Sequence, residues 1–210
     1  MTSTLSETDG RLLKGNETRS TILQVAVQIA SAEGLEGLSL GRLATEVGMS
    51  KSGLFAHFRS KEDLQVAVVD AASELFVQEV ILPAQSFPAG LQRLRSLAEN
   101  WLSYAGRRVF RGGCFFFAAS MEFDSRPGVV RERVKSLMLR WLQHLESEIR
   151  NAREAHELRP DADERQLAFE FNAQMMGANW AHQLMESKQA LERARTAIIQ
   201  RIESFAVQPT

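Results

Sequence analysis

The sequence predicts an all-α protein, and three observations lead to that prediction. Apolar residues recur at three- and four-residue intervals along nearly the whole chain, which is the spacing of one face of a helix. No stretch alternates apolar and polar residues convincingly enough to predict a strand. Serine, aspartate, glycine and proline bound the periodic segments, as they do where helices begin and end. With 210 residues and 44% hydrophobic content, the chain can bury a good core, as one domain or as a small module fused to a larger one.

The first two predicted helices each end at a glycine. The first spans about residues 17–33, and Gly34 follows it with the left-handed conformation that ends many helices. Ser39 can cap the second helix by accepting a hydrogen bond from a free amide of its first turn. Gly48 ends this second helix, which is therefore short.

The third and fourth predicted helices begin at serine caps. Ser50 precedes a helix with room only for residues 51–57 before the next cap. Ser60 and Asp63 stand three residues apart in the spacing of a capping box, in which two side chains satisfy amides at the start of a helix. The fourth helix is expected over 61–82.

The rest of the chain is also predicted to be helical. Further helices are expected at about 88–107, 113–124, 127–156, 164–186 and 189–206. The predicted organisation is a disordered tail over 1–15, a three-helix head over 16–62, a larger helical domain over 63–210, and a disordered end from 207. Since no low-complexity linker separates head and body, we expect them to be continuous through the helix at 61–82.

Composition excludes several classes of protein. The longest unbroken apolar run has six residues, against the roughly 20 that span a bilayer, and the first sixteen residues hold no secretory signal. The one cysteine, Cys114, cannot form an internal disulfide, which favours a reducing compartment. A cytoplasmic protein is therefore expected. The net charge is only −1, but residues 11–61 hold seven cationic against four anionic side chains, so the head is mildly basic.

The corner between the second and third helices has the properties of a DNA-binding surface. Leu54 and Phe58 are the apolar residues of the third helix, which leaves Ser50, Lys51, Ser52 and His57 on its N-terminal and outer surface. Small polar and cationic residues at the start of a helix suit the major groove, where base edges offer acceptors and phosphates flank them. A mere packing corner is the alternative, because helix corners occur in many helical proteins.

These residues also carry a resemblance. The segment LATEVGMSKSGLFAHFRSKEDL (43–64), preceded by IASAEGLEGLSL (29–40), resembles the DNA-binding head of the TetR family of bacterial transcriptional regulators over about residues 17–64. The resemblance implies a helix-turn-helix head and a C-terminal domain for ligand binding and dimerisation. It implies base contacts from Ser50, Lys51 and Ser52, and phosphate contacts from Ser39, His57 and Lys61. Arg42 would face the backbone or an adjacent base. Phe55 stands where the family usually has tyrosine, so one hydroxyl that could reach a phosphate is missing.

The body is expected to enclose a pocket. Aromatic residues and methionines are crowded between residues 101 and 180, with a few polar residues interleaved, which favours an apolar pocket with polar anchors. The candidate lining residues are Trp101, Tyr104, Phe117, Met121, Trp141 and Met175. Cys114 is interpreted as a small buried hydrophobe, with a redox sensor beside the nearby arginines as the alternative. The acids after Pro160 are interpreted as a helix cap and first turn, and no metal or cofactor is expected.

The last two predicted helices suggest self-association. The segment 167–185 is apolar on more than one side, and a helix with two apolar faces needs two partners, of which a second subunit is the natural one. The predicted dimer-interface residues are Phe171, Ala178, Leu191, Ala194, Ile198 and Ile202. The resemblance likewise implies a four-helix dimer interface.

These features together predict a homodimeric repressor that leaves a palindromic operator in double-stranded DNA when a small apolar or aromatic effector binds the body. The alternatives are an activator with the same head, an all-helical enzyme, and a protein-interaction module. An enzyme is not expected, because the sequence holds no P-loop, GxSxG, HExxH or GxGxxG motif.

Overall fold

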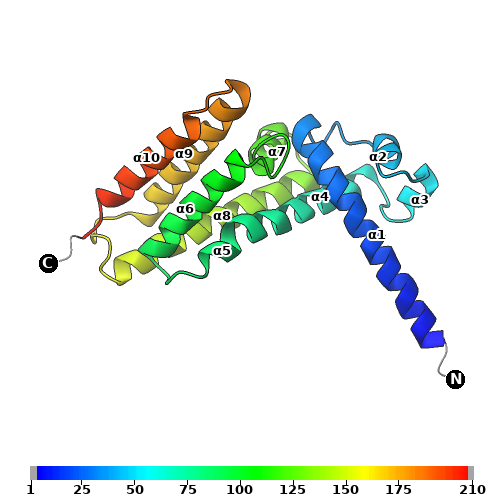
Figure 1. Ribbon diagram of the computed structural model, residues 1–210, viewed down its shortest axis with the longest axis horizontal. Helices are drawn as coiled ribbons and strands as arrows, with labels where there is room; N and C mark the ends of the chain where they lie inside the picture. The colour runs from blue at the N-terminus through cyan, green and yellow to red at the C-terminus, as the bar shows by residue number, and fades with distance from the viewer. Residues whose placement is uncertain (1–3, 208–210) are drawn as a thin grey trace.

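The computed structural model describes residues 4–207, with side chains from residue 15, and within that range it consists of helices joined by turns and loops (Figure 1). The helices are α1 (Thr4–Glu33), α2 (Leu40–Glu46), α3 (Lys51–Phe55), α4 (Lys61–Phe76), η1 (Val77–Ile81), α5 (Leu82–Ala84), α6 (Leu91–Gly106), α7 (Phe115–Phe123), α8 (Val129–Glu154), α9 (Glu164–Leu184) and α10 (Ala190–Glu203). The described residues contain no strand, only an isolated bridge between Leu158 and Ala206. The predicted all-α class is confirmed.

The short helices of the head begin at the predicted caps. The hydroxyl of Ser39 accepts a hydrogen bond from the Arg42 amide at 3.2 Å, and the hydroxyl of Ser50 accepts one from the Gly53 amide at 3.1 Å. The Ser60 hydroxyl caps α4 in the same way, through the amide of residue 63 at 3.0 Å. Both predicted stops also adopt the left-handed conformation, with φ of 83° at residue 34 and 67° at residue 48.

The first helix is longer than the sequence predicted. It begins at Thr4, whereas a start near residue 17 was expected, so the predicted start is wrong. The expected disorder of the 1–15 tail stays a prediction, and residues 1–3 lie outside the described residues. The prediction relied on apolar periodicity, which starts only near Ile22. Residues 4–15 contain no proline and several good helix formers, which allows the helix to begin before the apolar periodicity does.

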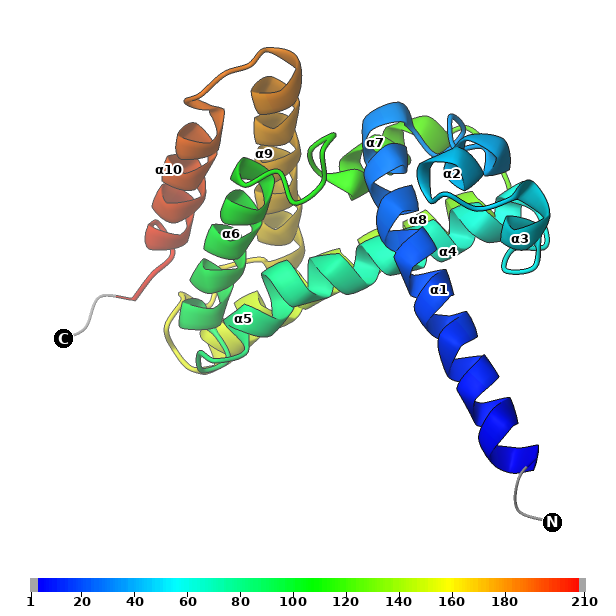
Figure 2. The ribbon, with the colours of Figure 1, turned by 45° about the vertical axis from the view of Figure 1, so that its right-hand side comes forward.

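The helix α4 connects the head to the body. It packs against α1 at one end and against α8 along its length, and it continues directly through η1 and α5 (Figure 2). The sequence predicted one helix over 61–82. The structure differs by the π-helical turn at Val77–Ile81, which ends two residues before Pro83. The proline nitrogen cannot donate the hydrogen bond that would continue an α-helix. Head and body are thus joined through a continuous helical path.

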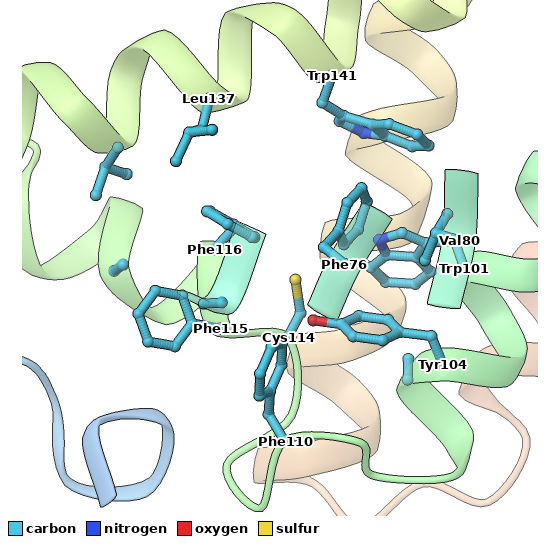
Figure 3. Close-up of a cluster of buried hydrophobic side chains, with 14 of the residues drawn as sticks. Phe76, Val80, Trp101, Tyr104, Phe110, Cys114, Phe115, Phe116, Leu137 and Trp141 are labelled. Atoms are coloured by element: carbon cyan, nitrogen blue, oxygen red, sulfur yellow. The ribbon is translucent and has the colours of Figure 1, made fainter. Parts of the chain in front are cut away.

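The core of the body is built around aromatic side chains. The ring of Phe76 on α4 makes edge-on contacts with Tyr104, Phe116 and Trp141, at centroid distances of 5.6, 5.8 and 5.2 Å (Figure 3). Such edge-to-face pairs stabilise a core beyond the burial of their area, by about 0.5–1.5 kcal/mol each. They hold α4, α6, α7 and α8 together at the point where α9 also packs on α8. Within 4–207, no helix is both long and apolar enough to cross a membrane.

Candidate functional site

The predicted DNA-contact residues lie on α2, α3 and the start of α4. Seven of the eight are exposed and His57 is half-buried. The seven are Ser39, Arg42, Ser50, Lys51, Ser52, Phe55 and Lys61. Leu54 and Phe58 are fully buried behind them, so the apolar and polar sides of α3 are divided as predicted. The structure therefore gathers these residues on the head, while their contact with DNA stays a prediction.

The cations of this surface differ in their partners. The Arg42 guanidinium pairs with Glu33 at 2.9 Å, and the Lys61 ammonium donates to the carbonyl and carboxylate of Glu36 at 2.8 and 3.0 Å. Lys51 has no ion pair or hydrogen bond within the part of the chain that the structure describes. Exposed ion pairs contribute only about 0–1 kcal/mol to the stability of a protein, so Arg42 and Lys61 can exchange their carboxylate partners for a phosphate. Lys51 would lose no such partner on binding DNA.

The side chain of Phe55 is 52% exposed at the C-terminal end of α3. Its neighbour Phe58 is buried, and the Arg19 guanidinium lies over that ring, 4.9 Å from its centre. Of the two phenylalanines of this segment, one therefore belongs to the core and the other faces solvent. Position 55 has room for the hydroxyl that a tyrosine would add.

An apolar cavity of about 290 Å³ lies in the body between α4, η1, α6, α7, α8 and α9. Its aromatic walls are Phe76, Trp101, Phe116, Phe117 and Trp141, and aliphatic side chains and the thioethers of Met138 and Met176 complete them. The polar lining groups are Ser73, Cys114, Arg140, His144 and Asn172. Figure 3 shows Phe76, Trp101 and Trp141 around one end of this space. A cavity of this size is at the lower end of the range for small-molecule sites, roughly 300–1,000 Å³.

Three of the six predicted pocket residues, Trp101, Phe117 and Trp141, line this cavity, and the other three do not. Tyr104 is buried behind the wall, with its hydroxyl directed at the Cys114 sulfur. Met121 is 61% exposed on the outer side of α7, and Met175 is buried away from the cavity, which Met176 lines instead. Successive side chains on a helix point about 100° apart, so an error of one position in the sequence selects a side chain on a different side of the helix.

The sequence analysis missed several lining residues. Phe76 and His144 were not among the predicted pocket residues, although both lie on apolar stripes of their helices. His144 could have been identified more easily from the sequence, because a polar residue on an otherwise apolar helix face indicates a polar group in a pocket.

Cys114 is a poor candidate for a redox sensor. Its side chain is 5% exposed, and burial in this apolar region raises the pKa of the thiol. The thiol therefore stays protonated, whereas oxidation needs the thiolate. Arg107, one of the arginines that precede Cys114 in the sequence, forms an ion pair with Glu79. The burial agrees with the interpretation of Cys114 as a small buried hydrophobe.

The segment containing α7 connects the cavity to the head. The Glu122 carboxylate accepts hydrogen bonds from the amides of Leu35 and Glu36, both at 2.8 Å, in the turn between α1 and α2. The loop before α7 is held by α1 as well: Gln28 donates to the carbonyl of Val109 at 2.9 Å and accepts from the amide of Arg111 at 3.0 Å. Because α7 also supplies cavity walls, one short helix contacts both the cavity and the head.

The same loop makes two further close contacts. The backbone passes so near α1 that a Cβ on Gly112 would lie 1.7 Å from the carbonyl oxygen of Ser31, so only glycine fits there. On the other side the Cys114 amide donates to the buried Asn179 on α9 at 2.8 Å. The loop is therefore fixed between the head and α9.

The predicted dimer-interface residues are internal to the chain. Phe171, Ala178, Ala194, Ile198 and Ile202 are each 6% exposed or less, and Leu191 is half-buried against the core. Their prediction as interface residues is wrong because α9 and α10 turn these faces toward each other and toward α6 and α8.

A second apolar face of α9 stays open to solvent. Phe169 is 66% exposed, Trp180 47%, Leu184 71% and Met185 62%. The first three stand eleven and four residues apart along α9, a helical spacing that aligns them on one side. The expectation that the 167–185 segment is apolar on two sides is confirmed, with the inward and outward faces interchanged.

Comparison with known proteins agrees with this architecture. Residues 22–68 match the family profile of bacterial regulatory proteins, tetR family, and residues 90–198 match the profile of the tetracyclin repressor-like C-terminal domain. The HTH-type transcriptional regulator AcrR of Shigella flexneri is 28% identical over 207 residues, which cover 94% of this chain and 93% of that protein.

Solved structures share the fold. A TetR transcriptional regulator from Chloroflexus aurantiacus J-10-FL superposes with a TM-score of 0.86 and 26% identity over 92% of this chain and 98% of that one. AibR, solved in complex with isovaleryl coenzyme A and operator DNA, superposes with a TM-score of 0.69 and 21% identity over 88% of this chain and 97% of that one.

Proposed function

The chain belongs to the TetR family of bacterial regulatory proteins, which are DNA-binding transcriptional regulators, and we propose that it is a homodimeric repressor released from a palindromic operator by a small effector. One observation carries the proposal furthest. The helix α7 lines the apolar cavity with Phe116 and Phe117 and also holds the head through Glu122. A molecule in the cavity therefore acts on a helix that positions the DNA-contact surface.

In this proposal α3 reads the operator. Ser50, Lys51 and Ser52 are exposed at its N-terminus, where side chains of a recognition helix meet base edges in the major groove. A single α3 of five residues offers too few contacts for a specific site. Two copies, about 34 Å apart in successive major grooves, would read a palindrome, because the symmetry of the DNA site mirrors that of the dimer.

The open face of α9 is the proposed dimer interface. A second copy of the chain is the natural occupant. A two-fold axis brings the same face of both subunits together, and an apolar helix face packs well on its own copy. Phe169, Trp180 and Leu184 supply the large side chains that dominate such contacts. Family membership supports the same arrangement.

For an effector to release the operator, the protein needs two states that bind the effector with different affinity. In the described state Phe116 and Phe117 lie on the cavity wall, and Glu122 lies about one and a half turns further along α7. An effector that displaces these two rings also displaces the carboxylate that holds the turn between α1 and α2. The two copies of α3 then no longer match successive grooves, and the operator is released.

The Glu122 contact can be tested directly. A Glu122→Gln variant keeps the size of the side chain, but its amide cannot accept from both backbone amides of residues 35 and 36. Hydrogen bonds to a charged acceptor contribute about 1.5–3 kcal/mol, so these two amides should exchange with solvent roughly 10- to 100-fold faster. Hydrogen-exchange NMR measures this effect, with Asp124→Asn, an exposed acid two positions along, as the control. Equal protection in Glu122→Gln and wild type would contradict the proposed link.

The exposed position of Phe55 leads to a second prediction. A Phe55→Tyr variant should bind the operator more tightly by about 0.5–1.5 kcal/mol, because the added hydroxyl can donate one hydrogen bond to a phosphate. Fluorescence anisotropy with labelled duplex DNA measures the change. Phe87→Tyr is the matched control, since Phe87 is 45% exposed but lies beyond α5, far from the head. An unchanged affinity would show that residue 55 does not face a phosphate in the complex.

Selection of bound sites from random duplex DNA with the purified protein tests the proposed function as a whole. A palindrome with half-sites one or more helical turns apart is expected. Failure to enrich any sequence would contradict it and favour a protein-interaction module. An activator would enrich the same kind of site, and a transcription assay then distinguishes it from a repressor. We propose no catalytic role for this protein. We propose a cytoplasmic location, because that is where its proposed partner, the bacterial DNA, lies.

A further inference from the structure

The polar lining groups of the cavity, Ser73, Cys114, Arg140, His144 and Asn172, can all donate a hydrogen bond. Arg140 and His144 stand four residues apart on α8, so they lie on the same side of that helix, and Asn172 approaches from α9. In the part of the chain that the structure describes, no aspartate or glutamate lines this cavity. Most of the remaining lining is apolar, and we call Arg140, His144 and Asn172 the cationic edge of the cavity.

Two of these groups have no adequate partner of their own. The Nε2 atom of His144 is buried and has no hydrogen-bond partner among the described residues, and an unpaired buried polar atom is destabilising. The amide nitrogen of Asn172 has only the sulfur of Met176, at 3.2 Å, which is a weak acceptor. A ligand oxygen atom beside either group would supply the acceptor that it lacks.

Arg140 is also without an anionic partner. Other arginines of the same helix are paired: Arg131 with Glu132, Arg133 with Asp70, and both Arg150 and Arg153 with Glu164. Arg140, exposed at the rim of the cavity, has no ion pair among the described residues. A guanidinium is built to bind a carboxylate through two parallel hydrogen bonds.

We propose that the effector is a small aromatic carboxylate whose ring lies between Trp101 and Trp141 and whose carboxylate meets Arg140 and His144. The inference rests on the proposed function, since it takes the cavity as the effector site. The volume of about 290 Å³ suits one or two fused rings and excludes a larger ligand without rearrangement.

The competing ligand classes fit the cavity less well. An aromatic cation would gain from the tryptophan faces, but it would meet Arg140 without any carboxylate in the lining to balance its charge. A neutral aromatic compound would fill the apolar part and leave the cationic edge with weaker partners. An aliphatic carboxylate would satisfy the edge and forgo ring stacking on the walls.

Calorimetric titration with three compounds of one ring system tests the class. The probes are 2-naphthoate, the neutral 2-naphthamide and the cationic 2-naphthylmethylamine. We expect 2-naphthoate to bind about tenfold to a hundredfold more tightly than the amide, because its two oxygens accept charge-assisted hydrogen bonds, and the amine to bind weakest. Equal affinities, or preference for the amide or amine, would overturn the inference.

Two variants locate the carboxylate. Arg140→Gln should lower the 2-naphthoate affinity roughly tenfold and leave the amide affinity unchanged, because the exposed side chain serves the charge and not the packing. Lys135→Gln, an exposed cation nearer the start of α8 and outside the cavity lining, is the control and should change neither affinity. Loss of affinity for both compounds in Arg140→Gln, or equal losses in both variants, would contradict the assigned role.

The pH dependence gives an independent readout of His144. Burial is the main cause that lowers the pKa of this imidazole; Glu148 on the same helix opposes the shift, and Arg93 on α6 adds to it. A bound carboxylate would raise that pKa, so binding takes up a proton and tightens as the pH falls, levelling off below the lowered pKa of the free protein. The naphthoate stays ionised above about pH 5. Between pH 8 and 6 we expect wild type to gain affinity and His144→Gln to show no such gain. The same pH profile in both would overturn the role of His144.

DNA binding separates failure of this inference from failure of the proposed function. The unliganded protein is titrated with its selected operator in the same preparation. Operator binding combined with an absence of 2-naphthoate binding at about 1 mM, an affinity near 4 kcal/mol, would reject the carboxylate class alone. Absence of operator binding would reject the proposed function, and tight 2-naphthoate binding by such a protein would still support the chemistry of the cavity.

Discussion

Replacing Trp180 with glutamate is expected to convert the proposed dimer into a monomer and to remove nearly all specific operator binding. Trp180 lies on the open face of α9 between Phe169 and Leu184 and is 47% exposed. Buried tryptophans at interfaces contribute about 2 kcal/mol or more, and the two-fold axis brings each change into the interface twice. The substitution also places two carboxylates in an apolar contact without partners, which adds a desolvation penalty.

Loss of the dimer affects DNA binding far more than loss of one contact. A monomer presents one α3, and its affinity should approach that for non-specific DNA, which is typically weaker than specific binding by about 10³-fold or more. Sedimentation velocity measures the oligomeric state, and anisotropy measures operator affinity. Because the side chain faces solvent, circular dichroism should show an unchanged helix content.

Phe87→Glu is the matched control for this experiment. Phe87 is 45% exposed, nearly the same fraction as Trp180, but it lies beyond α5 and away from α9. This variant should remain dimeric and bind the operator as the wild type does. A Trp180→Glu protein that sediments as a dimer would show that the subunits meet on another surface.

The starts of the helices could be predicted because they depend on neighbours within the sequence. Ser39, Ser50 and Ser60 each satisfy an amide three residues away, so the residue type and the spacing already contain the interaction. The same holds for Asp163, whose carboxylate caps α9 through the amides of residues 165 and 166. Such local chemistry also explains why the starts of α2, α3 and α4 were predicted to the residue.

The orientation of long apolar helices could not be predicted in the same way. α9 has apolar residues on two sides, and periodicity alone does not say which side meets α8 and α10. The prediction therefore placed Phe171 in the dimer interface, whereas it is buried and Phe169 faces solvent. The exchange of Met175 for Met176 in the cavity has the same cause.

Contacts between distant segments were outside the reach of pattern analysis. Glu122 meets the amides of Leu35 and Glu36, which lie 87 and 86 residues earlier in the chain. A glutamate on a short helix carries no sign of such a partner, since most glutamates of this type face solvent. The link between cavity and head therefore required the three-dimensional structure.

The two lysines of the head should respond differently to substitution by alanine. Lys51 begins α3 and has no partner within the described residues, so it can reach the guanine atoms O6 and N7. Lys51→Ala should relax base preference at one position of each half-site and cost about 1–3 kcal/mol per contact. Lys61 begins α4 and already binds Glu36, an exposed pair that a phosphate can replace. Lys61→Ala should therefore weaken binding to all sequences alike.

Salt titration on the selected operator and on scrambled DNA distinguishes these two roles. Each lost phosphate contact lowers the magnitude of the slope of log K against log salt by about 0.9, and a dimer loses two, so Lys61→Ala should change the slope by about 1.8. Lys135→Ala, a cation on α8 far along the chain from the head, should leave slope and affinity unchanged. An unchanged slope in Lys61→Ala would mean that Lys61 keeps its bond to Glu36 in the complex and only fixes the turn before α2. Equal weakening of operator and scrambled DNA by Lys51→Ala would place Lys51 at the backbone, and base recognition would then rest on Ser50 and Ser52, whose hydroxyls lie 3.1 Å apart at the start of α3.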